Sequence, residues 1–281
     1  LEDRGLIGHA RLAGPGAADS LKLFLEMAPS LNERDYLLTV FRELTRFAAT
    51  RELFDARHNP VWLLTPSAEG AKALVQLFAT PRADEPVFRF GQADTAFLGW
   101  VYQDLDADVR ARYALLQTPR FVESFILDRT LQPAIEKFGL DDTTLIDPTC
   151  GSGHFLLGAF DRLFAQRAKK QPGLAAREVA RRALDAIYGA DINPYAVAIA
   201  RFRLTLAFFE KAGFVRLADA PALLLHVVVA DSLLHNPHVM QGDLADFAPS
   251  STGWRGEEFA LENEAEARAV LHRQFAAVVG N

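Results

Sequence analysis

The fold of this chain is decided by one stretch, TLIDPTCGSGHFLLGAF, at residues 144–160. Its first four residues read as a short apolar strand ending on Asp147, and from His154 onward the spacing of apolar residues predicts a helix. Gly151 and Gly153 between them allow a tight turn and leave the backbone open to a ligand, because glycine has no Cβ. The stretch therefore predicts a strand, a glycine turn and a helix, with a ligand beyond the carboxyl end of the strand.

The glycine turn matches neither of two common nucleotide motifs. After Gly151 and Gly153, the third glycine of the dinucleotide fingerprint is replaced by Leu156. No Gly-Lys-Ser/Thr follows either, so the turn is not a phosphate-binding P-loop. A Gly-x-Gly pair has little specificity by itself, and the rest of the chain must indicate what the turn binds.

Working outward from this stretch, short apolar strands alternate with helices, which predicts an α/β fold of the Rossmann-like type with a mostly parallel sheet covered on both faces. The predicted strands are Thr144–Asp147, Ile187–Asp191, Leu225–Ala230 and Ala276–Gly280. The predicted helices are Pro119–Phe138, His154–Gln166, Ala175–Ala186, Pro194–Lys211 and Glu262–Arg273. The last strand has no helix after it, so we expect the chain to hold only the first half of such a domain.

The preceding residues have a different texture, and we expect two domains, 1–115 and 116–281. The apolar spacing in the first predicts helices over Glu33–Thr50 and Thr95–Tyr113, and Ser67 is expected to cap another. The second starts at Thr118-Pro119, read as an N-cap followed by proline at the first helical position. Apolar side chains are expected on the inner side of that helix, at Phe121, Val122, Phe125, Ile126 and Leu131.

Composition excludes several classes of protein. Hydrophobic residues make up 50% and charged residues 23%, which are globular values and exclude a disordered, collagen-like or coiled-coil chain. The apolar run from Leu223 to Ala230 is too short to span a membrane. A single cysteine, Cys150, excludes an internal disulfide and a Cys-x-x-Cys zinc site, and we expect a cytoplasmic protein without a metal site. The net charge of −6 means that any nucleic-acid contacts are local or lie elsewhere.

Acidic residues end the second and third predicted strands as well as the first. Asp191 lies about forty positions after the glycine turn, and Asp231 about forty further on. A carboxylate in the first of these positions suits a ribose diol, because it can accept two charge-assisted hydrogen bonds of roughly 1.5–3 kcal/mol each. One in the second position suits a donor such as an adenine amino group. Together they predict a pocket for an adenosine without a polyphosphate.

Five stretches then resemble the motifs of class I S-adenosylmethionine-dependent DNA methyltransferases that modify adenine at N6, in the gamma arrangement. They are TPRFV at 118–122, DPTCGSGHFLLGAF at 147–160, ADINPYA at 190–196, ADSL at 230–233 and VVGN at 278–281, the last resembling the start of an Asn-Pro-Pro-Tyr motif. With FLGWVYQDL at 97–105, the set is similar to the PglX-type methyltransferases of phage-growth-limitation and BREX defence systems. The resemblance covers residues 94–281.

This resemblance implies S-adenosylmethionine as the cofactor and gives roles to single residues. Those framing it would be Asp147, Thr149, Gly151 and Gly153, with Thr118 and Pro119 near its methionine end. Asp191 would hold the ribose hydroxyls, with Ile192 against the adenine ring. Asp231 would accept a hydrogen bond from the adenine amino group, with Leu233 beside it.

The resemblance also implies a catalytic residue and a substrate. Asn281 would accept a hydrogen bond from the target N6 amine and shape its lone pair for attack on the methyl group. The substrate would be an adenine in double-stranded DNA, which has to be flipped out of the duplex. The aromatic residue on which that base would stack lies beyond Asn281, so we expect no methylation by this chain alone. Marking of self DNA, with other defence proteins as partners, is the biological role implied.

Two other functions stay open. One is a protein-glutamine or RNA methyltransferase with the same Asn-Pro-Pro-Tyr chemistry, and the other is a scaffold or sensor that binds S-adenosylmethionine without transferring its methyl group. A run of basic residues is also open to two interpretations, a solvated helix face or a DNA-contacting track. Its members are Arg162, Arg167, Lys169, Lys170, Arg177, Arg181 and Arg182.

Overall fold

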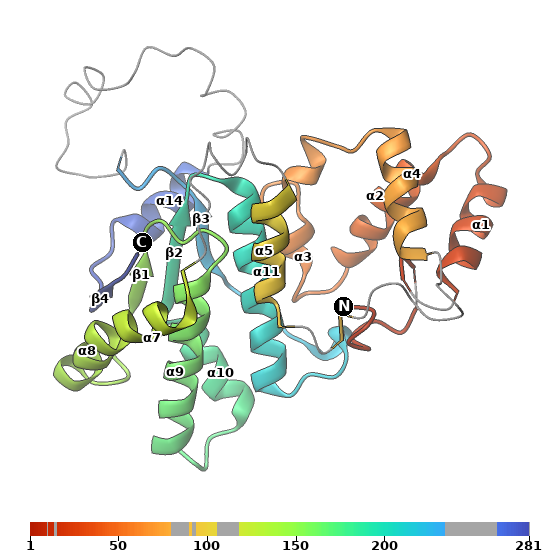
Figure 1. Ribbon diagram of the computed structural model, residues 1–281. Helices are drawn as coiled ribbons and strands as arrows, with labels where there is room; N and C mark the ends of the chain where they lie inside the picture. Colours follow the sequence, from red (N-terminus) through yellow and green to blue (C-terminus); the bar gives the residue numbers. More distant parts are fainter. Residues whose placement is uncertain are drawn as a thin grey trace, which may run out of the picture. The chain divides into compact units, whose positions relative to one another are not determined.

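The structure is a computed structural model that describes residues 1–9, 11–13, 16–79, 90–91, 94–105, 118–233 and 263–280, with only the backbone at 79, 103 and 105. Its contacts divide the chain into two compact units (Figure 1). The first consists of Leu1–Asp94 and Phe214–Leu223, and the second of Thr95–Gly213 and Leu224–Asn281. The domain boundary expected near residue 115 lies outside the described residues.

The first unit is helical where it is described. Its helices are α1 (Ala17–Met27), α2 (Glu33–Leu44), α3 (Arg51–Phe54) and α4 (Ala68–Ala79), with the short 3-10 helices η1 (Pro60–Trp62) and η2 (Leu217–Asp219). The helix expected over residues 33–50 ends earlier, at Leu44, whose carbonyl accepts a hydrogen bond from Thr50 Oγ1. Ser67 caps α4 as expected, because its Oγ accepts a hydrogen bond from the amide of Gly70 at 3.0 Å.

The second unit contains a parallel sheet of four described strands, which confirms the predicted α/β class. The strands are β1 (Leu145–Asp147), β2 (Ile187–Asp191), β3 (His226–Val229) and β4 (Ala277–Val278), in the spatial order β3-β2-β1-β4. All three neighbouring pairs are parallel. From β1 the chain therefore proceeds outward to β3 and then returns to β4 on the other side of β1. In such sheets ligands bind beyond the carboxyl ends of the strands where the order reverses, which here lies between β1 and β4.

Helices cover both faces of this sheet. On one face α14 (Glu264–Leu271) packs against β2 and β3, and its Ala267 and Val270 share an apolar cluster with Ile146, Tyr188 and Val228. On the other face lie α9 (His154–Lys170) and α11 (Pro194–Ala212), with α10 (Ala176–Leu184) packed on both of them (Figure 1). Helix α5 (Ala96–Leu105) lies against α11. This double cover explains why the strands are mainly apolar.

One predicted helix was wrong in extent. Instead of a single helix over residues 119–138, the structure has α7 (Arg120–Arg129) and α8 (Leu131–Phe138), broken at Thr130. Pro133 explains the break. Proline has no N–H to donate to the carbonyl four residues earlier, which belongs to Arg129, and its ring clashes with that carbonyl. The expected inner face was also wrong at Phe121 and Phe125, which are 76% and 59% exposed.

The start of α7 differs from the prediction by one residue. Pro119 is the N-cap rather than the first helical residue, with φ of −59° and ψ of 143°, and Thr118 lies outside the helix. The carbonyl of Pro119 accepts the amides of Val122 and Glu123, at 2.9 and 3.1 Å. The fixed φ of proline fits this extended conformation as readily as it fits a first helical turn.

Candidate functional site

The glycine turn connects β1 to α9 and has a backbone conformation that would be strained for residues other than glycine. Gly151 and Gly153 have φ of 51° and 85°, in the left-handed region that side chains disfavour. A Cβ at Gly153 would lie 3.0 Å from the Cβ of Ala200 on α11. The turn therefore requires glycine at 153 for two reasons, the backbone conformation and the close approach of α11.

Asp191, at the carboxyl end of β2, joins this turn through its side chain. Its Oδ2 accepts a hydrogen bond of 2.8 Å from the amide of Gly151, and its Oδ1 accepts one of 2.8 Å from the amide of Asn193. The side chain is half-buried, and burial raises the pKa of Asp191 above its ordinary value. Each carboxylate oxygen keeps a further lone pair with which it can accept a hydrogen bond from a ligand.

Asp147, at the end of β1, lies deeper than Asp191. It is 1% exposed, and its Oδ1 accepts a hydrogen bond of 3.0 Å from the amide of Thr149. Burial raises the pKa of Asp147 to about 7, and the negative charge of Asp191 acts in the same direction. A cationic group placed beside these two carboxylates would be attracted by both and would favour their charged forms.

The end of β4 reaches the same place. A Cβ at Gly280 would lie 3.2 Å from Oγ1 of Thr149 and 3.5 Å from Oδ1 of Asp147. Glycine at this position thus keeps the space beside the two polar groups open. The residue after it, Asn281, lies outside the described residues, so its expected role stays a prediction.

The remaining residues singled out from the sequence lie at the ends of neighbouring elements. Asp231 follows β3, where its Oδ1 accepts the amide of Leu233 at 3.0 Å, and Leu233 is 73% exposed. Ile192, partly buried, follows Asp191 directly. Thr118 and Pro119 precede α7, the helix that packs on α9. Hydrogen bonds thus join Thr149 to Asp147 and Gly151 to Asp191, and Gly280 lies beside the first of these pairs. The adjoining strand and helix ends carry the other five residues, Asp231, Leu233, Ile192, Thr118 and Pro119.

Two side chains in or beside the turn are unsuited to catalysis. Cys150 is buried, and this burial, helped by the charges of Asp191 and Asp147, raises the pKa of its thiol well above the usual value. Burial lowers the pKa of His154 to about 4, with Arg203 and Arg120 acting in the same direction, so its ring is neutral at pH 7. Within the described ranges, no group of three or more His, Cys, Asp or Glu residues could hold a metal ion.

Two residues that contact the site were missed by sequence reasoning. Tyr102 on α5 bonds to the side chain of Asn193, two residues after Asp191. Arg203 on α11 is 3% exposed and bonds to the carbonyl of Ser152 inside the glycine turn. The only signal for Arg203 was a charged residue within the apolar stretch ARFRLTLAFF at 200–209. For Tyr102 the only signal was its place in the stretch FLGWVYQDL, which belongs to the family resemblance but gave this residue no role.

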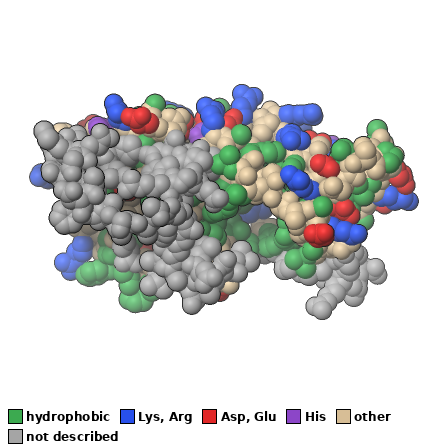
Figure 2. All heavy atoms as spheres, turned by 90° about the horizontal axis from the view of Figure 1, so that it is seen from above, with side chains coloured by type: hydrophobic (Ala, Val, Ile, Leu, Met, Phe, Trp, Pro, Cys, Tyr) green, Lys and Arg blue, Asp and Glu red, His purple; other side chains and the backbone are tan. Residues whose placement is uncertain are grey.

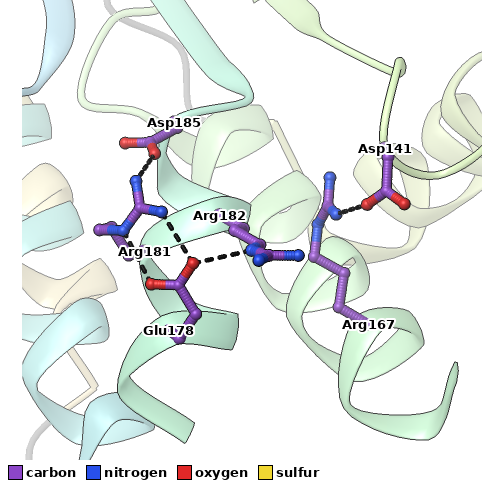
Figure 3. Close-up of polar contacts among 6 residues, drawn as sticks. All are labelled: Asp141, Arg167, Glu178, Arg181, Arg182 and Asp185. Carbon is purple, nitrogen blue, oxygen red and sulfur yellow. Dashed lines mark hydrogen bonds and ion pairs between the residues drawn. The ribbon is translucent and has the colours of Figure 1, made fainter. Parts of the chain in front are cut away.

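The basic run is largely paired with acidic side chains (Figure 3). Arg167 is buried and bonds to Asp141 and to the carbonyl of Leu140. Arg181 pairs with Glu178 and Asp185, and Arg182 pairs with Glu178 (Figure 3). Arg162 pairs with Asp128 in the same way. These ion pairs favour a structural role over a DNA-contacting track, on a solvated helix face for Arg181 and Arg182 and in the interior for Arg167.

Charges of both signs also mix elsewhere on the molecule. Figure 2 shows Lys and Arg side chains interspersed with Asp and Glu on the described part of one face.

None of the helices that the structure describes has both the length and the apolar character needed to cross a membrane.

Comparison with known proteins gives a relative that spans the whole chain. No protein-family model matches the chain. The chain is 39% identical, over an alignment of 306 residues that covers all of it, to a protein of Streptomyces coelicolor (strain ATCC BAA-471 / A3(2) / M145) described as "Adenine-specific methyltransferase PglX". The chain spans about a quarter (25%) of the length of that relative. This confirms the predicted resemblance to PglX-type methyltransferases.

Proposed function

We propose that this chain forms the S-adenosylmethionine-binding part of a methyltransferase that modifies adenine at N6 in a specific sequence of double-stranded DNA. The observation that carries the proposal is the hydrogen bond between Gly151 and Asp191, which joins a glycine turn to an acidic strand end, as a single ligand contacting both would require. The similarity to a protein described as an adenine-specific methyltransferase supports methyl transfer and adenine as the base. S-adenosylmethionine as the methyl donor is what the motif resemblance implies.

The hydrogen-bond acceptors and the open space at the strand ends fit this cofactor. A ribose offers two hydroxyl donors, and Asp191 keeps an accepting lone pair on each oxygen. The methionine part carries a sulfonium and an ammonium group, and the carboxylates of the buried Asp147 and the half-buried Asp191 attract positive charge. Gly280 leaves space beside Thr149 and Asp147 that a side chain would fill. Thr118 and Pro119 are proposed to lie at the methionine end.

The adenine ring is assigned to the neighbouring strand ends. Ile192 offers an apolar contact for one face of the ring, and Asp231 offers a carboxylate for its amino group. Leu233, exposed in the structure, would then be covered by the ring. These three residues follow β2 and β3, which are adjacent in the sheet.

The chemistry proposed for the site needs neither a nucleophilic side chain nor a metal ion. S-adenosylmethionine supplies, when bound, an electrophilic methyl group on its sulfonium. The protein has to hold that methyl group in line with the N6 nitrogen, and such positioning is worth several kcal/mol of barrier, up to about 11. Asn281, directly after Gly280, would accept a hydrogen bond from the N6 amine and direct its lone pair.

The substrate and the partners follow from the same proposal. The chain carries a net charge of −6, and four arginines of its basic run pair with acids, so the main phosphate contacts would come from other parts of the protein. The protein would act in the bacterial cytoplasm, marking self DNA within a phage-defence system and alongside its other proteins.

The test is a methylation map of DNA from a host that has no adenine methylation of its own and expresses the complete reading frame. We expect N6-methyladenine at one recurring short sequence. Co-expression with the neighbouring defence genes covers dependence on a partner. A blank map under both conditions would reject the proposal. Transfer of labelled methyl groups to RNA or protein would then identify the other methyltransferase class, and cofactor binding without transfer would identify a scaffold or sensor.

A further inference from the structure

Helix α5 and the residue before it carry two polar side chains, Tyr102 and Thr95, that the proposed function does not use. Thr95 stands directly before its first residue, and Tyr102 lies seven positions later, which is two helical turns and therefore the same face. In Figure 1, α5 runs alongside α11, against which it packs. Both polar side chains connect, through one intermediate each, to a loop of the proposed cofactor site.

The connection from Tyr102 leads to the end of β2. Nδ2 of Asn193 donates a hydrogen bond of 2.6 Å to the hydroxyl oxygen of Tyr102. Asn193 is fully buried, and its Oδ1 accepts the amides of Tyr195 and Ala196, which caps α11. Its own amide donates to Oδ1 of Asp191 at 2.8 Å. Tyr102 therefore restrains the residue that fixes one oxygen of Asp191.

Tyr102 keeps the neutral hydroxyl that this connection needs. Burial raises the pKa of Tyr102 to about 12, and the negative charge of Asp191 acts in the same direction. The ring also lies against that of Tyr195, with centroids 6.4 Å apart. The hydroxyl is thus placed by packing as well as by its hydrogen bond.

The connection from Thr95 leads to the glycine turn. Nε of Arg203 donates to Oγ1 of Thr95 at 3.4 Å, and its Nη1 donates to the carbonyl of Ser152 at 2.6 Å and to the Ser152 hydroxyl at 3.2 Å. Burial lowers the pKa of Arg203 to about 10, so the guanidinium stays charged at pH 7. A charged donor holding the central carbonyl of a turn restrains how that turn presents its amides.

We propose that α5 braces the cofactor site, with Tyr102 positioning Asp191 for the ribose and Arg203 positioning the Gly151–Gly153 turn for the amino-acid part of the cofactor. This inference rests on the proposed function, because it divides the same site between two ends of one ligand. It assigns a role to the stretch FLGWVYQDL at 97–105, which contains none of the residues proposed to touch the cofactor.

The two roles can be separated with two ligands. S-adenosylhomocysteine contains adenosine and the amino-acid part, whereas 5′-methylthioadenosine contains adenosine without the amino-acid part. A residue that acts on the ribose end affects the binding of both, and a residue that acts on the amino-acid end affects only the first. A general loss of folding would weaken both ligands in every variant.

The experiment measures both affinities by calorimetry, using the whole protein and its variants. Tyr102→Phe is expected to weaken both ligands about three- to tenfold, the loss typical of one hydrogen bond. Placed in an Asp191→Ala background, the same change should have no further effect, because both oxygens through which Tyr102 acts on the ribose are then absent. Arg203→Met is expected to weaken S-adenosylhomocysteine about tenfold or more and to leave 5′-methylthioadenosine within about twofold.

Controls and a second variant keep these results interpretable. Arg203→Lys retains the charge and should restore most of the affinity lost in Arg203→Met. Tyr188→Phe and Arg182→Met make the same chemical changes away from the carboxyl ends of the strands, so they should leave both affinities unchanged. Thermal unfolding of each variant shows whether it folds, and Arg203→Gln, which removes the charge but keeps a polar side chain, carries the test if the methionine variant does not fold.

Each possible result of this experiment supports or overturns the proposed brace. Equal losses of both ligands in Arg203→Met, or a loss in Tyr102→Phe that persists in the Asp191→Ala background, would overturn the brace. Wild-type binding with unchanged affinities in both variants would overturn it as well while leaving the proposed function intact. If the wild-type protein binds none of the three compounds, S-adenosylhomocysteine, 5′-methylthioadenosine and S-adenosylmethionine, the proposed function and the brace are overturned together.

Discussion

The amide of Gly151 donates a hydrogen bond of 2.8 Å to Oδ2 of Asp191, a residue 40 positions further along the chain. This bond fixes the turn after β1 against the end of β2, so the two loops form one surface. The amide of Asn193 holds the other oxygen of the same carboxylate. Asp191 is thereby oriented before any ligand arrives, which lowers the entropy that a ligand would lose in ordering it.

Asp191→Ala is expected to weaken the binding of S-adenosylmethionine by at least ~1.5 kcal/mol, because it removes a charge-assisted acceptor and the tie to Gly151. Isothermal calorimetry on the whole protein measures this loss. The matched control is Asp185→Ala, which removes the carboxylate that pairs with Arg181, and this variant should bind normally. Unchanged affinity in Asp191→Ala would contradict the ribose assignment.

Asp147→Asn is expected to change how stability depends on pH. The pKa of Asp147 is raised from 3.8 to about 7 in the folded protein, so between these values the folded state keeps a proton that the unfolded state has lost. The free energy of unfolding of the wild type therefore falls as the pH rises through this window. Asparagine cannot titrate, so the variant lacks this loss.

Urea unfolding of wild type and Asp147→Asn at about pH 5 and about pH 8 measures this difference. Relative to the wild type, the variant should be more stable at the higher pH than at the lower. The other carboxyl groups are common to both proteins and cancel. A difference that is the same at both pH values would show that Asp147 titrates normally.

Gly153→Ala is expected to destabilise the protein more than Gly151→Ala. Both residues have positive φ, and adopting it costs a non-glycine residue roughly 1–2 kcal/mol. At 153 the new Cβ would also approach Ala200 to 3.0 Å, whereas at 151 no described atom lies within 4 Å. Denaturant unfolding gives the two free energies, and an equal loss would mean that α11 can move away.

Arg181→Ala combined with Arg182→Ala is expected to leave DNA binding unchanged. Both guanidinium groups pair with acids on their own helix or just after it, and exposed pairs of this kind contribute about 0–1 kcal/mol to stability. Fluorescence anisotropy with duplex DNA at several salt concentrations measures the affinity. A salt slope smaller by about one for each arginine would instead show direct phosphate contacts.

Local sequence features predicted most of the second unit. Apolar runs, glycines and strand-ending aspartates identified β1, β2 and β3 and the helices α9, α10 and α11 to within a few residues, because short-range sterics and burial decide these elements. The single helix over 119–138 was predicted wrongly. Its apolar spacing was read across Pro133, whose missing N–H breaks the helix at Thr130.

By itself, therefore, the sequence determined the α/β class, the glycine turn and the acidic strand ends, since each depends on residues adjacent in the chain. Only the tertiary structure decided which of them meet. The strand order places Gly280 beside Thr149, and the packing of α5 and α11 brings Tyr102 to Asn193 and Arg203 to Ser152. These contacts join residues 51 to 131 positions apart (203 − 152 and 280 − 149), a separation at which the amino-acid pattern carries no distance information and only the packed sheet brings the residues together.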